Sequence, residues 1–71
     1  MSSLRSVRVG MMLSQRDLAR EAGVTQKTIV DLELGRIEPR LQTMRKIAAA
    51  LGVGPREIDE FRRAIEVKVA A

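Results

Sequence analysis

The stretch SQRDLAREAGVTQKTIVDLELG, residues 14–35, predicts two short helices joined by a tight turn. Ser14 and Asp17 stand at the spacing of a capping box, in which each side chain accepts a hydrogen bond from the backbone N–H of the other residue. A helix is therefore expected to begin at Gln15. Gly23 is placed to end it, because glycine readily adopts the left-handed conformation that often follows a helix. Helix, glycine-containing turn and helix are the sequence form of a DNA-binding helix-turn-helix.

The second helix of this stretch has one inward and one outward face. Thr25 is expected to cap its start, and Gly35 to close it. Ile29 and Leu32 are spaced as an inward stripe. The residues predicted to point outward are Gln26, Lys27, Val30 and Asp31.

The chain resembles the lambda-repressor-like family of the Cro and phage-repressor type, also called the xenobiotic-response-element family. The matching residues are Ser14-Gln15, Leu18-Ala19, Gly23-Val24, Ile29 and Leu32-Glu33-Leu34-Gly35, followed by Pro39, Leu41, Met44, Ile47, Ala48 and Leu51-Gly52-Val53. The resemblance covers roughly Leu4 to Phe61. It implies an all-α, compact five-helix DNA-binding domain with the helix-turn-helix at its second and third helices.

Length and composition exclude several functional classes. Seventy-one residues allow one small domain, and the absence of Cys and His removes disulfides, thiolate zinc sites and the usual general base. We therefore expect no enzyme activity, no metal and no cofactor. No long apolar run or signal peptide is visible, which predicts a cytoplasmic protein without membrane contact. Phe61 is the only aromatic residue, which disfavours base stacking of the kind seen in single-strand and RNA binders.

The charge of the chain is uneven. Residues 1–46 carry nine basic and five acidic side chains, whereas residues 47–71 carry four of each, so the net charge of +4 lies in the first part. Basic side chains often only solvate helices. Together with the helix-turn-helix pattern, however, this excess supports double-stranded DNA as the partner.

The remaining segments predict three further helices. The first spans Leu4 to about Met12, where exposed Val9 and Met11 either contact another chain or pack adaptably. Another spans Leu41 to Leu51, lacks a capping side chain at position 40, and ends at Gly52. Its predicted core stripe is Leu41, Met44, Ile47, Ala48 and Leu51.

The last helix is expected to open at Gly54-Pro55 and to close the core with Ile58 and Phe61. We divide the chain into a helix-turn-helix domain, residues 1–63, and a C-terminal extension, residues 64–71. The extension fits a continued helix or a strand, and the sequence leaves both open. Its apolar residues predict a dimer interface, with a frayed tail as the alternative; they are Ile65, Val67 and Val69.

The resemblance places four residues at base-reading positions: Gln26, Lys27, Val30 and Asp31. Gln pairs with adenine, Lys donates to guanine, and Val30 suits a thymine methyl group. Asp31 has two interpretations. In the first, its carboxylate accepts a hydrogen bond from cytosine N4. In the second, nearby phosphates repel the carboxylate from the DNA, and it pairs with Lys27 one turn earlier in the helix.

Other residues are assigned to the DNA backbone and to the scaffold. The predicted phosphate contacts are Gln15, Thr25, Thr28, Arg36 and Arg40. For Arg36 and Arg40 the alternative is a pair of solvated loop charges. The resemblance also implies a partly buried ion pair between Arg8 and Glu33, with a phosphate contact of Arg8 as the alternative.

These observations predict a small homodimeric transcriptional regulator, a repressor in this interpretation. It would read a near-palindromic operator with the helix after Thr25 in the major groove. The alternative is an antitoxin or another protein-interaction module of the same fold, which binds a partner protein through the surface of Val9 and Met11 or through the C-terminal extension.

Overall fold

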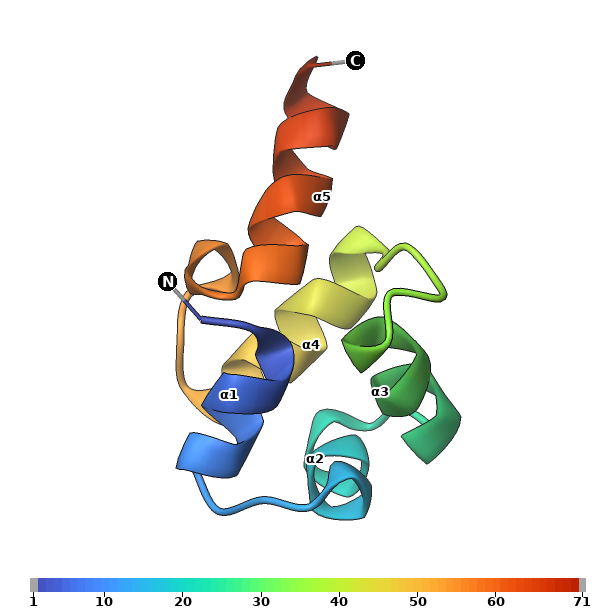
Figure 1. Ribbon diagram of the computed structural model, residues 1–71, viewed down its shortest axis with the longest axis vertical. Coiled ribbons are helices and arrows are strands. Elements are labelled where there is room, and N and C mark those ends of the chain that lie inside the picture. The colour runs from blue at the N-terminus through green and yellow to red at the C-terminus, as the bar shows by residue number, and fades with distance from the viewer. Residues whose placement is uncertain (1, 71) are drawn as a thin grey trace.

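The polypeptide folds into helices around one apolar core (Figure 1). A computed structural model describes residues 2–70. Its elements are α1 (Leu4–Gly10), α2 (Gln15–Ala22), α3 (Gln26–Glu33), α4 (Leu41–Leu51), the 3-10 helix η1 (Pro55–Glu57) and α5 (Asp59–Ala70). The five α-helices of residues 2–70 confirm the predicted all-α class, with the helix-turn-helix at α2 and α3.

Local capping explains where α2 and α3 begin. The Ser14 hydroxyl accepts from the Asp17 N–H at 2.9 Å, and an Asp17 carboxylate oxygen accepts from the Ser14 N–H at 3.2 Å. The Thr25 hydroxyl accepts from the Thr28 N–H at 3.2 Å. Each bond satisfies a backbone donor that the first turn of a helix leaves without a partner. Both predicted helix starts are confirmed.

The turn between α2 and α3 depends on Gly23. Its φ of +70° is unfavourable for residues with a side chain, and it lets the chain fold back over the end of α2. There the Gly23 N–H donates to the Arg20 carbonyl, and the Val24 N–H donates to the Ala19 carbonyl at 3.0 Å. This is a Schellman motif, and it places Val24 against the core. It therefore sets the direction in which α3 leaves the turn.

The core supports α3 from behind. Ile29 and Leu32 of α3 are fully buried and belong to the same cluster as Leu18 of α2 and Phe61 of α5. Its other members are Leu4, Ala19, Ala22, Met44, Ile47, Leu51, Ile58 and Ala64. In Figure 1, α2 and α3 lie at one end of the molecule and α5 projects from the other. The outer face of α3 is thus held on a packed base.

Three predictions about α1 and α4 are wrong. Helix α1 ends at Gly10 rather than near Met12, which has a φ of +58° where the chain turns toward α2. Val9 and Met11 are exposed, so adaptable packing does not explain them. Leu41 is also exposed and does not belong to the core, because it occupies the first turn of α4, one turn before Met44, where the buried stripe begins.

The predicted single last helix is divided into η1 and α5. Ile58 between them is extended and forms a parallel bridge with Ser2. The Asp59 N–H then donates to the Ser2 carbonyl at 2.8 Å. Ser2 therefore accepts the hydrogen bond of a backbone N–H that, in a continuous helix, would have bonded to a carbonyl of the same helix.

Helix α5 crosses the proposed boundary after residue 63 without a break. Ala64 belongs to the core and Ile65 packs against it, so the extension is the outer part of α5 and the strand alternative is wrong. Val67 and Val69 project from it with 63% and 73% of their surface exposed. Within residues 2–70, no helix combines the length and the apolar character needed to cross a bilayer.

Candidate nucleic-acid interface

The outer face of α3 begins with two exposed side chains, Gln26 and Lys27, directly after the Thr25 cap. Val30, one turn further, is half-buried. Because Ile29 and Leu32 anchor the opposite face, these side chains cannot turn inward without unpacking the core. The first turns of α3 are therefore a fixed and solvent-exposed surface.

Asp31 does not point outward as predicted. Its side chain is 8% exposed, and its carboxylate accepts a hydrogen bond from Lys27 Nζ at 2.7 Å. Arg36 Nη1 lies 3.6 Å from the other carboxylate oxygen. The Lys27 hydrogen bond, with the charges of Lys27 and Arg36, holds the pKa of Asp31 below its usual value. Of the two interpretations of Asp31, the structure contains the pairing with Lys27.

Arg36 reaches Asp31 because the chain reverses at the end of α3. Gly35 has a φ of +72°, its N–H donates to the Leu32 carbonyl, and the Arg36 N–H donates to the Asp31 carbonyl at 2.8 Å. This second Schellman motif brings Arg36 back beside α3. The sequence contained the signal for this chain reversal, because Gly35 was expected to end the helix. The resulting position of Arg36 beside Asp31 was not predicted.

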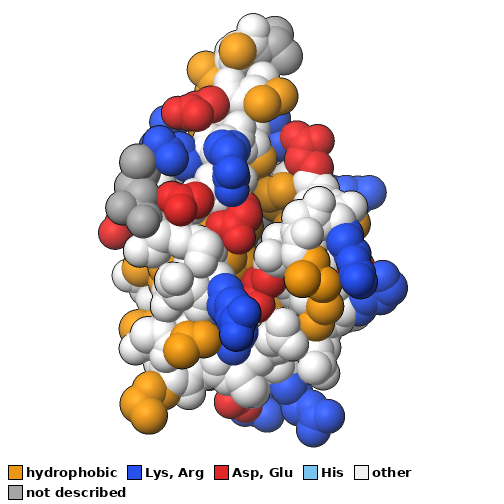
Figure 2. Space-filling model, in the orientation of Figure 1, with side chains coloured by type: hydrophobic (Ala, Val, Ile, Leu, Met, Phe, Trp, Pro, Cys, Tyr) orange, Lys and Arg blue, Asp and Glu red, His pale blue; other side chains and the backbone are white. Residues whose placement is uncertain are grey.

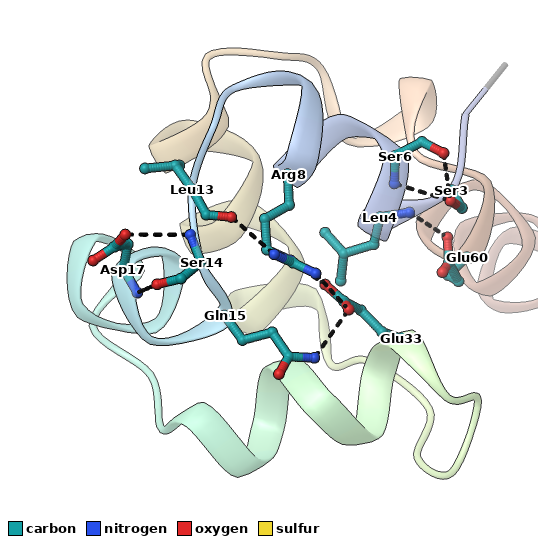
Figure 3. A network of polar contacts seen from close by, with 10 residues as sticks. All are labelled: Ser3, Leu4, Ser6, Arg8, Leu13, Ser14, Gln15, Asp17, Glu33 and Glu60. Carbon is teal, nitrogen blue, oxygen red and sulfur yellow. Dashed lines mark hydrogen bonds and ion pairs between the residues drawn. The ribbon is translucent and has the colours of Figure 1, made fainter.

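An ion pair between Arg8 and Glu33 joins α1 to the end of α3 (Figure 3). Arg8 Nε donates to Glu33 Oε2 at 2.6 Å and Nη2 donates to Oε1 at 3.2 Å, while Nη1 donates to the Leu13 carbonyl at 2.8 Å. The two side chains are only 10% and 5% exposed. With its guanidinium engaged and buried, Arg8 is not available to a phosphate, so that alternative is wrong.

The same carboxylate also holds Gln15, which sequence reasoning did not foresee. Gln15 Nε2 donates to Glu33 Oε1 at 3.1 Å, so the first residue of α2 is tied to the last residue of α3. Figure 3 shows Gln15 and Arg8 converging on Glu33 from different helices. The amide nitrogen of Gln15 carries two protons, and this bond uses one of them.

The remaining predicted phosphate ligands lie around the start of α3 and on the loop after it. The hydroxyls of Thr25 and Thr28 are 2.9 Å apart. Arg36 and Arg40 are exposed on the loop that follows α3. Figure 2 shows basic side chains along this edge of the molecule, over the end of α3 and the loop. Cationic and hydroxyl groups thus border the exposed turns of α3 on more than one side.

Comparison with known proteins agrees with this geometry. Residues 4–58 match the Helix-turn-helix family model HTH_3. An uncharacterized HTH-type transcriptional regulator of Methanothermobacter thermautotrophicus is 45% identical over 49 residues, which are 69% of this chain and 71% of the relative. A second uncharacterized HTH-type transcriptional regulator, from Methanocaldococcus jannaschii, is 44% identical over 41 residues, covering 58% of this chain and 62% of the relative.

Proposed function

Because the chain belongs to the lambda-repressor-like helix-turn-helix family and is a DNA-binding transcription regulator, we propose that it acts as a homodimeric repressor. In this proposal each subunit places α3 in the major groove of one half of a near-palindromic operator. Occupation of promoter DNA then blocks transcription.

One observation carries the proposal: α3 is buried along Ile29 and Leu32 while Gln26 and Lys27 stand exposed on its first turn. The major groove is about 12 Å wide and admits one α-helix, and each base pair there presents a distinct set of donors and acceptors. The amide of Gln26 matches adenine, the ammonium group of Lys27 matches guanine, and Val30 offers an apolar surface to a thymine methyl group.

The groups around α3 suit the role of phosphate ligands. The free amide proton of Gln15, the hydroxyls of Thr25 and Thr28, and the guanidinium groups of Arg36 and Arg40 would bind the two backbones that border the groove. Such contacts fix the position of the helix and supply affinity that depends on salt, whereas base contacts select the sequence.

The sequencing of bound fragments tests the proposal as a whole. Purified protein is incubated with sheared genomic DNA at low salt, and the retained fragments are sequenced. We expect a shared two-fold motif with half-sites about one helical turn apart. Retention of no duplex at any salt concentration would reject DNA binding and favour the protein-interaction alternative.

Replacing Gln26 with alanine is expected to reduce discrimination between the operator and unrelated DNA by about 1–3 kcal/mol, because one base contact is lost. The measurement is a pair of binding titrations, one on each duplex. Gln42→Ala is the matched control, since Gln42 is an exposed glutamine of α4. An equal loss of affinity for both duplexes would contradict a base-reading role for Gln26.

Replacing Arg36 with alanine is expected to weaken binding to every duplex by a similar factor. The slope of log affinity against log salt concentration should fall by about one unit, since one phosphate contact is removed. Arg56→Ala, at an exposed arginine of η1, is the control and should leave the slope unchanged. A slope that does not change in Arg36→Ala rules out the phosphate contact.

A further inference from the structure

We propose that Asp31 is a positioning residue that sets the specificity of DNA binding, because its carboxylate holds the Lys27 ammonium group against α3 and withholds it from phosphates. The inference rests on the proposed function and deepens it. It replaces the expectation that Asp31 itself contacts a base.

The first step is the geometry of the pair. The side chain of Lys27 is 84% exposed along its length, yet its Nζ lies 2.7 Å from the Oδ2 atom of Asp31, whose side chain is 8% exposed. Side chains on a helix lean toward its N-terminus, so the Asp31 carboxylate reaches back over the turn that carries Lys27 and meets its ammonium group there. The exposed stem of Lys27 is thus fixed at its far end by a buried carboxylate.

The second step separates Lys27 from Arg36. Arg36 is placed by the backbone bond from its N–H to the Asp31 carbonyl, and its guanidinium approaches the carboxylate only to 3.6 Å. That distance is an ion pair but too long for a good hydrogen bond. Asp31 therefore holds Lys27 tightly and Arg36 loosely, and the N–H groups of Arg36 stay available to a phosphate.

The third step is the effect on different duplexes. A free lysine at the edge of the interface would reach the nearest phosphate on any sequence, which raises affinity without selecting a site. A lysine held along α3 can donate to a guanine only where the base sequence provides one. The restraint on Lys27 therefore weakens unspecific binding more than binding to the operator.

The test compares Asp31→Asn with the wild-type protein on operator and on unrelated duplex over a series of salt concentrations. Asparagine keeps the shape of the side chain and removes its charge. Glu57→Gln is the matched control, because it removes one exposed carboxylate from η1, which lies apart from α3 in Figure 1, and glutamine can still accept from the Gly54 N–H. Both substitutions are then repeated in a Lys27→Met background.

We expect Asp31→Asn to bind unrelated duplex more tightly and to steepen its salt slope by about one unit, as the released lysine gains a phosphate contact. The ratio of operator to unrelated affinity should fall about tenfold. In the Lys27→Met background the same substitution should no longer steepen the slope. Glu57→Gln should leave the ratio unchanged.

Three results would overturn the inference while leaving the proposed function intact. The first is an Asp31→Asn variant whose affinity ratio and salt slope are unchanged, and the second is a steeper salt slope that persists in the Lys27→Met background. The third is a loss of discrimination at only one base pair of the operator. The last would show that Asp31 reads a base directly. Absence of any DNA binding by the wild-type protein would instead refute the proposed function, and this inference with it.

A second variant covers the case in which Asp31→Asn does not fold. Lys27→Met alone should lower affinity for the operator and leave the salt slope on unrelated duplex unchanged, since a restrained lysine makes no phosphate contact. A slope lower by one unit in Lys27→Met would show that Lys27 already binds a phosphate, and that Asp31 does not restrain it.

Discussion

Replacing Glu33 with alanine is expected to lower the free energy of unfolding by about 3–5 kcal/mol, because the buried Arg8 guanidinium would lose its charged partner. Arg8 would keep only its bond to the Leu13 carbonyl, and Gln15 would lose its anchor. A domain of this length has a total stability of roughly 4–11 kcal/mol. The midpoint of thermal unfolding should therefore fall by more than about 12 °C.

The matched control for this prediction is Glu38→Ala. Glu38 also faces a basic residue, Lys68 at 3.9 Å, but its side chain is 63% exposed, and such surface pairs contribute about 0–1 kcal/mol. A double variant, Arg8→Leu with Glu33→Leu, should recover much of the lost stability, since no buried charge is left alone. If Glu33→Ala unfolds at the same denaturant concentration as Glu38→Ala, the ion pair does not stabilise the fold.

The parts of the fold that were predictable are those encoded by neighbouring residues. Ser14 with Asp17, Thr25 and Gly23 each act within a few positions of the chain, so their spacing alone located both helices of the helix-turn-helix. The buried stripe of α3 followed from the same local periodicity. The missing side-chain cap at Arg40 was also visible, and α4 begins there without one.

Contacts between distant residues were not predictable from spacing. The Leu4 N–H donates to Glu60 Oε1 across 56 positions, and Ser2 pairs with Ile58, which interrupts the last helix. No local sequence pattern predicts either contact. Both depend on how α1 and α5 meet around the core.

The candidate site was predictable in composition and less so in geometry. The exposed positions of Gln26 and Lys27 follow from helical periodicity, whereas the burial of Asp31 depends on the chain reversal at Gly35. Periodicity treats a helix as isolated, and it cannot show that the next segment returns to cover one of its side chains.

Helix α5 carries the remaining large prediction, which concerns dimerisation. Val67 and Val69 are exposed, and Val67 borders an open hollow of about 260 Å³ between α5 and the loop after α3, lined also by Ile37 and Pro39. Apolar side chains in such a position suit a second subunit.

Replacing both Val67 and Val69 with glutamate is expected to give monomers in sedimentation experiments and to weaken binding to a complete operator by about 10²–10⁴-fold. The loss reflects the effective concentration that linkage of two half-site contacts provides. The affinity of this variant for an isolated half-site should fall only slightly, because the two added negative charges repel DNA. The matched control is Val9→Glu with Met11→Glu, which adds the same charges at two exposed apolar residues of the α1 region.

The control also decides between two locations for the interface. If the α5 variant stays dimeric and the variant at Val9 and Met11 becomes monomeric, the subunits meet through the end of α1, and the proposed role of α5 is wrong. If both variants stay dimeric, neither apolar surface joins the subunits. The wild-type protein could also sediment as a monomer and bind the complete operator no more tightly than a half-site. That result would contradict the proposed dimer, because linkage of two subunits would then contribute nothing to affinity.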